Sequence, residues 1–574
     1  MDLESSGPSR REFLNGAAAA AVTLAGGGIL ADGAVAPPAA AAATGTANPA
    51  ADETIEVQVV VVGSGLGGLA AAMTAAEEGA KKVVLLEKED YWGGATNWAE
   101  GNGRGQSTEA EARRSAISRV KSSGYMANPM LYYHMALDRK EDTDWLFDKH
   151  QVKTESTSIA GGAPGGGQGP MPGGVLSQMP GGGQGQAPAG EGPAGGGQGQ
   201  MPGGSQGQAP GGGGRPGGGP SFYAGGNGRS CIATLIPQAK ALGIDLRLKT
   251  PAISLLMKDP YTCTGVRAKN AEGKIIDFKA KAVVLATGGM STNKALLAKY
   301  SSIDMGKVLI DGPASGQDGD GHVMVEATAH GKAMHLCVAS LFINVKGFAY
   351  ASPMGVCAGM QPTNLWVNQD AVRFADESIV SSTEGCNKMV EIQGSVYSIM
   401  DEAGFDKYAG GGCQSHYSGF ADKLIGKPIP GLAGEFEKVK HLPDVFYAQS
   451  IEELAQKMGI DAAVFKETVE KYNGFAKSGT DEEWGKKASN LWPIEKAPFY
   501  GFRLSSGMLN TNGGIRINTN AQVVDPRYKA ITGLYAAGIA TSGWMGETYL
   551  GGGCQPVALW CGRKAAKHIV ASLL

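Results

Sequence analysis

The chain has 574 residues, of which 89 are glycine, about twice the usual share of roughly 7 %. Hydrophobic residues make up 42 %, which is enough to bury a large core, so the composition excludes wholesale disorder. The 51 basic and 54 acidic residues give a net charge of −3, which offers no electrostatic case for a nucleic-acid partner.

The first 54 residues have the pattern of an export signal followed by an Ala-rich linker. Ser9-Arg10-Arg11-Glu12-Phe13-Leu14 is a twin-arginine pattern, and a weakly apolar run from Ala17 to Leu30 follows it. We therefore expect export by the twin-arginine pathway to the periplasm or the cell surface. This route carries folded proteins, which suits a chain that takes up a cofactor before export. A disordered Ala-rich tail is the alternative.

Residues 56–87 predict a dinucleotide-binding unit. A buried strand at 56–62 leads into Gly63-Ser64-Gly65-Leu66-Gly67-Gly68, a helix at 69–76, a second strand at 82–86 and then Glu87. In such a turn the first glycine permits tight bending, the second lets the backbone approach a pyrophosphate, and the last lets helix and strand pack closely. The helix N-terminus offers free N–H groups to phosphate, and Glu87 is placed to bind the adenosine ribose.

Four further pieces follow along the chain: Gly93-Gly94-Ala95-Thr96-Asn97, a strand and glycine turn at 282–289, a third such element at 533–538, and a closing helix at about 555–571. In this order, and with Gly319-Asp320-Gly321, the pieces resemble the FAD-dependent fumarate reductase flavoprotein superfamily, which includes urocanate reductases and 3-ketosteroid dehydrogenases. The resemblance covers about residues 55–150 and 225–574.

The resemblance implies an α/β fold. A Rossmann-like FAD-binding domain of the glutathione-reductase type would be built from separated segments, and an α+β capping domain would be inserted in it. FAD would be held non-covalently. The residues expected to contact it are Gly63, Ser64, Gly65, Gly67, Gly68, Glu87, Lys88, Gly94, Ala95, Thr96, Asn97, Ala286, Thr287, Gly288, Gly289, Asp320, Gly538, Gln555 and Val557.

The expected domain boundaries follow from this order. The N-terminal portion of the FAD-binding domain spans 55–341, the cap spans 342–488 and the C-terminal portion of the FAD-binding domain spans 489–574, with Pro498-Phe499-Tyr500 marking the return from the cap. Within the N-terminal portion, residues 161–220 hold 28 Gly, 10 Pro and 8 Gln, with Glu191 and Arg215 as their only charges. Such a segment cannot bury a core, so we expect a flexible surface insertion.

The cap carries two recognisable features. Arg373-Phe374-Ala375-Asp376-Glu377 is a form of the family's RF-x-N-E motif. Residues 451–476 have apolar side chains at helical spacing, and these predict core positions rather than a site. The core positions are Leu454, Met458, Ala462, Phe465, Val469 and Tyr472.

Departures from the family motifs bear on the substrate. In fumarate-reducing members an Arg and a His hold the dicarboxylate and a cap Arg delivers the proton. Here the three positions fall at Tyr549, Asn510 and near Ser381. Losing all three cations removes the charge-assisted bonds that a dicarboxylate needs, so we do not expect fumarate to be the substrate.

Tyr549-Leu550-Gly551-Gly552-Gly553 resembles the Tyr-x-x-x-Gly element of the 3-ketosteroid dehydrogenases, where the Tyr hydroxyl and the Gly N–H bind a substrate carbonyl. The resemblance implies these roles for Tyr549 and Gly553, and two preorganised donors favour an enolate-like oxygen. A packing role beside the flavin is the alternative for Tyr549. Tyr350 is the first candidate for the other proton-transfer residue, followed by Tyr397 and Tyr417.

We therefore expect an exported FAD oxidoreductase that reduces, or forms, a C=C bond conjugated to a carbonyl in a largely apolar molecule, such as a steroid, by hydride transfer at flavin N5. A separate membrane-linked partner would supply or accept the electrons. One alternative is a urocanate- or acrylate-type reductase of small acids, using Arg503 or Arg229. A second is a surface adhesion protein on a flavin-fold scaffold.

All eight cysteines lie between Cys231 and Cys561, and none forms a CxxC pair. Buried thiols are the default expectation for such positions. An iron–sulfur cluster ligated by scattered cysteines is an alternative, and disulfide pairing does not follow from the sequence.

Overall fold

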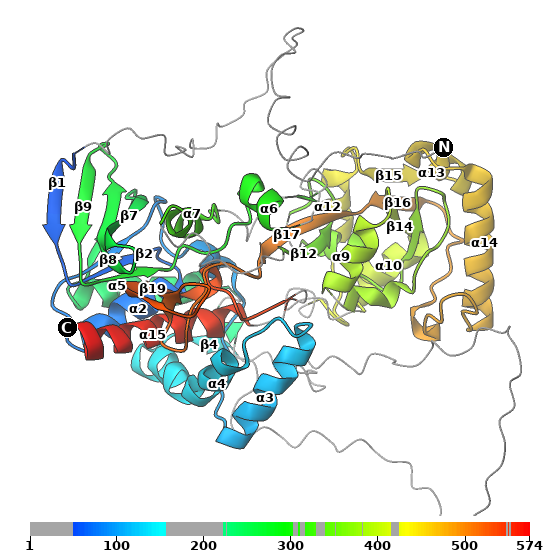
Figure 1. The fold of residues 1–574 in the computed structure, drawn as a ribbon. Helices are drawn as coiled ribbons and strands as arrows, with labels where there is room; N and C mark the ends of the chain where they lie inside the picture. Colours follow the sequence, from blue (N-terminus) through cyan, green and yellow to red (C-terminus); the bar gives the residue numbers. More distant parts are fainter. Residues whose placement is uncertain are drawn as a thin grey trace, which may run out of the picture. The chain divides into compact units, whose positions relative to one another are not determined.

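The expected nucleotide-binding strand, β2 (Val59–Val62), forms in the middle of the largest sheet (Figure 1). The structure is a computed structural model. It describes residues 50–155, 222–224, 227–301, 308–309, 316–328, 339–349, 352–381, 383–414, 424–546, 549 and 553–574. The twin-arginine segment, the 161–220 block, Tyr350 and Tyr417 lie outside these residues.

The largest sheet has ten strands in the order β1-β9-β8-β19-β10-β2-β3-β6, with β18 paired to β19 and β7 paired to β8. All four residues of β2, β3 and β10 are buried, and runs apolar on both faces are typical of a covered parallel sheet. The strands are β1 (Glu53–Glu56), β3 (Val83–Leu86), β6 (Asp245–Arg247), β7 (Ala252–Asp259), β8 (Thr262–Lys269), β9 (Ile275–Lys279), β10 (Ala282–Leu285), β18 (Gln522–Val524) and β19 (Ala530–Ala536).

The register aligns the ends of the central strands. β2 pairs in parallel with β3 on one side and with β10 on the other, so that Val62 lies opposite both Leu86 and Leu285. β19 pairs in parallel with the other edge of β10. Four strands from distant parts of the chain therefore end together, and the expected glycine turns follow three of them.

The helices of this part of the chain are α2 (Leu66–Glu77), α3 (Glu109–Ser122), α4 (Pro129–Asp144), α5 (Arg229–Ala241), α6 (Lys294–Tyr300), α7 (Asp320–Glu326) and α15 (Cys554–Leu573). Of these, α2, α7 and α15 pack against strands of the sheet. α2 and α15 lie side by side (Figure 1). They approach closely, because a Cβ atom on Gly562 would lie 2.2 Å from the carbonyl oxygen of Gly67. The C-terminal helix is thus part of the nucleotide-binding unit.

The cap contains an antiparallel four-stranded sheet in the order β13-β14-β16-β15. Its strands are β13 (Leu365–Asn368), β14 (Val396–Asp401), β15 (Val445–Ala448) and β16 (Phe499–Arg503), and its helices are α8 (Pro353–Gly359), α9 (Thr383–Glu391), α10 (Glu402–Gly411), α12 (Leu432–Val439), α13 (Ile451–Met458) and α14 (Ala462–Ser478). β16 lies beyond the expected cap boundary at residue 488. A short buried apolar strand fits either sheet, and only its pairing with β14 and β15 assigns it to the cap.

The chain leaves the cap through β17 (Ser505–Thr511), which follows β16 after a single residue. β17 pairs in parallel with β11 (Val308–Leu309) and antiparallel with β12 (Ala339–Asn344). Asn510 and Thr511 at its C-terminal end reach the FAD-binding unit, where Thr511 Oγ1 accepts a hydrogen bond from the backbone N–H of Met290 at 3.2 Å.

The predicted helical run at 451–476 forms as two helices, α13 and α14. Gly459 ends α13 in the left-handed conformation, with φ 73°, and the Asp461 side chain caps α14 by accepting hydrogen bonds from two backbone N–H groups. Leu454, Met458, Phe465, Val469 and Tyr472 are buried, so the prediction of core positions is confirmed, and Ala462 is partly buried against the same cluster.

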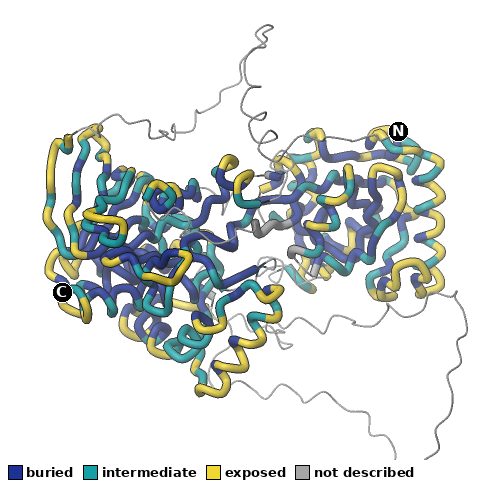
Figure 2. Tube along the Cα trace, in the orientation of Figure 1, coloured by how far each residue is buried: buried dark blue, intermediate teal, exposed yellow. Residues whose placement is uncertain are grey.

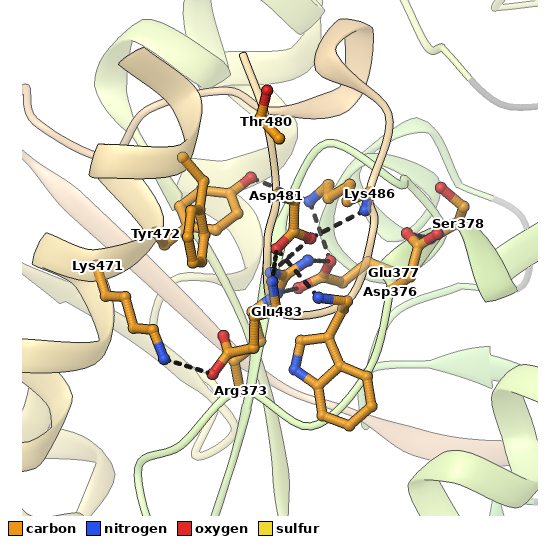
Figure 3. Close-up of polar contacts among 12 residues, drawn as sticks. Arg373, Asp376, Glu377, Ser378, Lys471, Tyr472, Thr480, Asp481, Glu483 and Lys486 are labelled. Carbon is orange, nitrogen blue, oxygen red and sulfur yellow. Dashed lines mark hydrogen bonds and ion pairs between the residues drawn. The ribbon is translucent and has the colours of Figure 1, made fainter. Parts of the chain in front are cut away.

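The RF-x-N-E-like segment lies in a buried charge cluster within the cap (Figure 3). The Arg373 guanidinium makes a bidentate pair with Glu377, at 3.0 and 2.9 Å, and a further pair with Asp481 at 2.9 Å. Lys486 Nζ lies 3.1 Å from the same Glu377 carboxylate and donates to the Tyr472 hydroxyl at 3.0 Å. The cluster joins the segment from β13 to η5 (Glu377–Ser381), α14 and the loop after α14.

Buried residues concentrate in the strands and in the helix faces that cover them (Figure 2). One apolar cluster belongs to the FAD-binding unit, and two lie on the cap sheet. Among the described helices, none combines the length and the apolar character that a membrane span requires.

Candidate functional site

The chain's own packing requires two glycines of the nucleotide-binding turn. Gly63 has φ +102°, and a Cβ atom there would lie 2.3 Å from the carbonyl oxygen of Ala286. A Cβ on Gly68 would lie 1.9 Å from the carbonyl oxygen of Gly63. Both contacts are too short for any side chain, so these positions let β2, α2 and the β10 turn approach one another.

Gly65 differs from these two. A Cβ there would meet its nearest protein atom, Thr96 Oγ1, only at 3.5 Å, and a Cβ on Gly94 would meet nothing within 4 Å. A methyl group at Gly65 would thus make only ordinary van der Waals contacts, so the chain's own packing does not explain this glycine. The N-cap residue Gly65 has no side chain to cap α2, and the first turn has no acidic residue. A glycine that the protein's own packing does not require, at a helix N-terminus without an acidic side chain, fits the diphosphate of a dinucleotide.

Glu87 stands at the end of β3 and is held in place by the turn. Its carboxylate accepts hydrogen bonds from the Ser64 backbone N–H at 3.0 Å, from Ser64 Oγ at 2.5 Å and from the backbone N–H of Glu89 at 3.0 Å. The side chain is almost fully buried. The acid is thus fixed at the strand end where the ribose of a bound dinucleotide would lie.

The η1 segment (Gly94–Trp98) closes the other side of the turn. Thr96 Oγ1 accepts from the backbone N–H of Leu66 at 3.0 Å, and Ser64 Oγ accepts from the backbone N–H of Gly93 at 2.9 Å. Ala95 lies in the same short helix, and Asn97 Nδ2 donates to the Trp92 carbonyl at 2.9 Å. Ala95, Thr96 and Asn97 therefore shape the turn.

Lys88 and Asp320, both expected to contact the cofactor, contact each other. Lys88 Nζ lies 2.9 Å from Asp320 Oδ2 and also pairs with Asp318. Burial favours the neutral amine, but the charge of Asp320 and the bonds to both carboxylates outweigh it and raise the pKa of Lys88. The same pairing outweighs burial at Asp318 and lowers the pKa of its carboxyl group. This ion-pair cluster ties the end of β3 to the start of α7.

The turn after β10 brings Ala286, Thr287, Gly288 and Gly289 against the first glycine turn. Gly288 has φ +74°, and a Cβ on Gly289 would lie 2.5 Å from Thr511 Oγ1. Among the described residues, the buried hydroxyl of Thr287 has no hydrogen-bond partner. A buried polar atom without a partner at this turn fits a ligand that completes the site.

A pocket lies where β17, the segment after β19 and the start of α15 meet. About 270 Å³ of space between its lining atoms is not filled by protein atoms, and part of that space is open to solvent. Its lining residues are Asn510, Thr511, Asn512, Gly513, Ile539, Thr541, Trp544, Met545, Cys554 and Val557. None of these side chains carries a charge. The pocket borders the expected cofactor residues, because Gly538 directly precedes Ile539 and Val557 belongs to the lining.

Gln555 lies on the first turn of α15, and its Oε1 accepts a hydrogen bond from the Tyr223 hydroxyl at 3.3 Å. Tyr549 is half-buried against the core of the FAD-binding unit, and its side chain hydrogen-bonds the Cys554 thiol. Burial outweighs this bond and raises the pKa of Cys554 to about 11. Gly553 directly precedes Cys554, so Tyr549 and Gly553 both adjoin this lining residue, although neither belongs to the lining itself.

The other tyrosine candidates are placed differently. Tyr350 and Tyr417 lie outside the described residues, as do Thr548 and the stretch 550–552. Tyr397 belongs to the cap core, where its hydroxyl donates to the Met458 carbonyl at 3.0 Å. Sequence reasoning did not single out Thr541, Trp544 and Met545. The flanking glycines, Gly543 and Gly546, are a weak sign that the backbone turns sharply there.

His322 was also not anticipated. It follows Gly319-Asp320-Gly321, is fully buried and lies close enough to Gly514 that a Cβ there would be 2.6 Å from His322 Nε2. Burial lowers the pKa of His322 to about 4, against a smaller opposing effect of the Ala540 carbonyl. Within the described ranges, no three His, Cys, Asp or Glu side chains gather as metal ligands, so nothing there supports an iron–sulfur cluster.

Comparison with known proteins agrees with this geometry. The profile of the FAD binding domain family matches residues 58–555. The chain is 29 % identical to the vinyl phenol reductase of Lactiplantibacillus plantarum, over 89 % of this chain and 95 % of that protein. It is also 29 % identical to the urocanate reductase of Eggerthella lenta, over 88 % of this chain and 73 % of that protein.

A similar solved structure is the 3-ketosteroid Δ1-dehydrogenase of Sterolibacterium denitrificans, with a TM-score of 0.62 and 18 % identity over 90 % of this chain and all of that one. It shows the same fold. The glycine turn, the fixed acid and the unpartnered Thr287 hydroxyl fit FAD, which would lie along Gly65 and reach toward the pocket. The chain belongs to the FAD binding domain family, and it is an FAD-dependent oxidoreductase that acts on carbon–carbon double bonds.

Proposed function

We propose that the enzyme reduces a C=C bond conjugated to a carbonyl group in a largely apolar substrate, such as a steroid-like enone or lactone. The observation that carries this proposal is the neutral lining of the pocket. A dicarboxylate held in a buried site needs cations to replace its hydration. Five of the ten lining residues, Ile539, Trp544, Met545, Cys554 and Val557, present apolar or thiol surface instead.

Tyr549 and Gly553 are the proposed carbonyl-binding pair. Cys554 lies in the pocket wall, hydrogen-bonds the Tyr549 side chain and follows Gly553 in the chain. A substrate oxygen at this end of the pocket can accept from the Tyr549 hydroxyl and from the Gly553 backbone N–H. Two fixed donors stabilise the enolate-like oxygen of the transition state more than the ground-state ketone, and this difference accelerates the reaction.

FAD held by the Gly63–Gly68 turn and Glu87 would, when reduced, supply a hydride to the β-carbon of the substrate. As the C=C electrons move toward the carbonyl, Tyr549 and Gly553 hold the developing negative charge on the oxygen. A proton then adds to the α-carbon, from Tyr350 or from water. The net change is one hydride and one proton added across the double bond, and dehydrogenation is the same chemistry reversed.

The decisive experiment is Tyr549→Phe, assayed with chemically reduced enzyme under anaerobic conditions. We expect kcat/KM for an enone substrate to fall by about 10²–10³, with FAD content unchanged. Tyr528→Phe is the matched control, because Tyr528 is an exposed tyrosine whose hydroxyl accepts a hydrogen bond from Asn128 at 3.2 Å, on an exposed part of the surface. If Tyr549→Phe changes kcat/KM by less than about threefold, the carbonyl-donor role is excluded.

Reduction of small unsaturated acids is less well supported. Of the two arginines considered for carboxylate binding, Arg503 already has Asp444 at 3.4 Å and donates to the Tyr397 hydroxyl at 3.2 Å. Arg229 is exposed and lies over the Trp98 ring, 5.6 Å from its centroid. Neither belongs to the pocket lining. An anaerobic screen against enones, steroids and acrylates, following flavin reoxidation, separates the two substrate classes.

We also propose that the protein is exported through the twin-arginine pathway and exchanges electrons with a separate membrane-linked partner. Ser9-Arg10-Arg11-Glu12-Phe13-Leu14 supports the first point. Replacing Arg10 and Arg11 together by Lys should keep the protein inside the cell in a fractionation experiment.

The proposed electron exchange with a membrane-linked partner has its own test. Washed membranes supplied with an electron donor should reduce the bound flavin, and the soluble fraction should not.

A further inference from the structure

One polar atom in the pocket wall is left without a partner. Asn510 lies at the end of β17, is 4 % exposed and lines the pocket, and its carboxamide oxygen has no hydrogen-bond partner among the described residues. Buried polar groups in folded proteins are almost always hydrogen-bonded. A buried acceptor beside a cavity therefore points to a donor on the molecule that fills the cavity.

The orientation of the Asn510 amide is set by its neighbours. Asn512 Nδ2 donates to the Gly546 carbonyl at 3.3 Å, which turns Asn512 Oδ1 toward Asn510. Asn510 Nδ2 faces this oxygen at 3.4 Å and the Cys554 sulfur at 3.6 Å. Flipping the Asn510 amide would set two carbonyl oxygens against each other. The unpartnered atom is thus the acceptor oxygen and not the NH2 group.

The other polar side chains of the lining are already engaged. Thr511 Oγ1 accepts from the Met290 N–H, and Thr541 Oγ1 donates to the Gly538 carbonyl at 2.6 Å. Trp544 Nε1 donates to Thr541 Oγ1 at 2.8 Å. The Cys554 thiol contacts Tyr549. Within the described lining, Asn510 Oδ1 is the side-chain polar atom that has no hydrogen-bond partner. It is therefore the side-chain atom of the lining that is available to bind a polar group of a ligand.

We propose that Asn510 selects substrates that carry a neutral O–H or N–H donor in addition to the reducible double bond. The donor belongs to the organic substrate. In an otherwise apolar molecule, the simplest such donor is a phenolic or alcoholic hydroxyl group. Asn510 is thus a specificity-determining residue. This inference rests on the proposed function, because it concerns the same pocket.

The geometry favours a hydroxyl over a charged group. An amide oxygen accepts one or two hydrogen bonds but carries no net charge, so it cannot balance a buried ammonium group. The same oxygen repels a carboxylate, because both are acceptors. Replacing a hydroxyl by its methyl ether keeps the apolar contacts and removes the donor, and a site built around the hydroxyl discriminates between the two.

The experiment compares para-hydroxybenzylideneacetone with its O-methyl ether, using holoenzyme reduced anaerobically. We expect wild-type kcat/KM to favour the hydroxyl compound by about tenfold, the factor expected of one net hydrogen bond. Asn510→Ala should bring the two compounds within about threefold of each other by lowering kcat/KM for the hydroxyl compound alone. Asn510→Leu, which fills more of the volume, should do the same, and Asn270→Ala, in the turn between β8 and β9, is the matched control.

The FAD dissociation constant is measured on the same variants. It should change by less than about threefold, because the donor is on the substrate. If Asn510→Ala instead weakens FAD binding by tenfold and leaves the substrate ratio unchanged, the donor is the imide N–H of the flavin and the proposal is overturned. A wild-type enzyme without hydroxyl preference also overturns it, because a water molecule would then satisfy Asn510. In that case the proposed function stands as long as both enones are reduced and Tyr549→Phe lowers kcat/KM by about 10²–10³.

Discussion

The Lys486 ammonium nitrogen lies 3.1 Å from a Glu377 carboxylate oxygen, and both side chains are fully buried in the cap. Glu377 also binds Arg373 through both of its oxygens, so one anion is shared by two cations. Removing one partner from a buried ion pair leaves an uncompensated charge. The cluster therefore makes the cap sensitive to single isosteric changes at this point (Figure 3).

Glu377→Gln tests this sensitivity. Without the carboxylate, Arg373 keeps its ion pair with Asp481 but Lys486 loses its ion pair, and we expect the free energy of unfolding to fall by about 3–5 kcal/mol. The measurement is urea unfolding at neutral pH. Glu483→Gln is the control, because Glu483 pairs with the exposed Lys471 and should matter little. Equal stability of the two variants would show that the buried cluster does not stabilise the cap.

Gly65→Ala and Gly68→Ala should have separate effects. Gly65 has φ −61°, and a Cβ there would make only ordinary van der Waals contacts, so alanine should leave the fold intact and obstruct the cofactor. We expect purified Gly65→Ala to be folded with FAD binding weakened by about tenfold or more. Gly68→Ala should lower the free energy of unfolding by at least about 1–3 kcal/mol, because its Cβ would collide with the Gly63 carbonyl.

Flavin absorbance and thermal melting of the apoproteins distinguish these outcomes. Both are measured on each variant, after removal of FAD for the melting curve. If Gly65→Ala keeps full FAD content, or if its apoprotein melts as early as that of Gly68→Ala, then the assignment of Gly65 to the cofactor is incorrect.

His322 should make stability depend on acidity. Its folded-state pKa of about 4 lies below the ordinary value of 6.5, so the unfolded chain binds the proton more readily. The contribution of the neutral His322 ring to the free energy of unfolding is fully present above pH 6.5 and is lost as the pH falls toward 4. This loss amounts to about 3 kcal/mol. His322→Met, with unfolding measured from pH 7 to about 4, should remove this part of the slope. If the free energy of unfolding of His322→Met depends on pH as steeply as that of the wild type, His322 is not the source of this pH dependence.

The thiols of Cys357 and Cys413 should be unreactive in the native protein. Their sulfur atoms lie 3.9 Å apart in the cap core, and both residues are fully buried. The hydrogen bond with Cys413, together with burial, raises the pKa of the Cys357 thiol, so little thiolate forms at neutral pH. Iodoacetamide labelling followed by peptide mass spectrometry should modify Cys357 only after unfolding. Rapid labelling of the native protein would show that this region of the cap opens.

The local elements of the fold were predictable because their signals are local. The strand at 56–62, the glycine turn and Glu87 all depend on residues close in sequence, and the structure has the shorter β2 at Val59–Val62, followed by α2 and β3. The closing helix was predicted at about 555–571 and forms at Cys554–Leu573. The division of the 451–476 run was missed, because Gly459 and Asp461 interrupt a continuous apolar pattern without breaking its period.

Long-range pairings were not predictable in the same way. Phe499–Arg503 is apolar enough to enter either sheet, and its place between β14 and β15 depends on strands about 100 and 50 residues earlier. Lys88 meets Asp320 across 232 positions. The unpartnered oxygen of Asn510 depends on the carbonyl of Gly546 through Asn512, and no motif encodes such a relation.

The position of β19 has a consequence for biosynthesis. This strand pairs with β8 and with β10, and β10 in turn pairs with β2. It is nevertheless the last long strand to be synthesised, and α15, which packs against α2, follows it. A ribosome must therefore release nearly the whole chain before the central sheet can close. Flavin loading is then a late event, after translation, and a chain truncated before residue 530 would expose an incomplete sheet edge and become a substrate for proteolytic quality control.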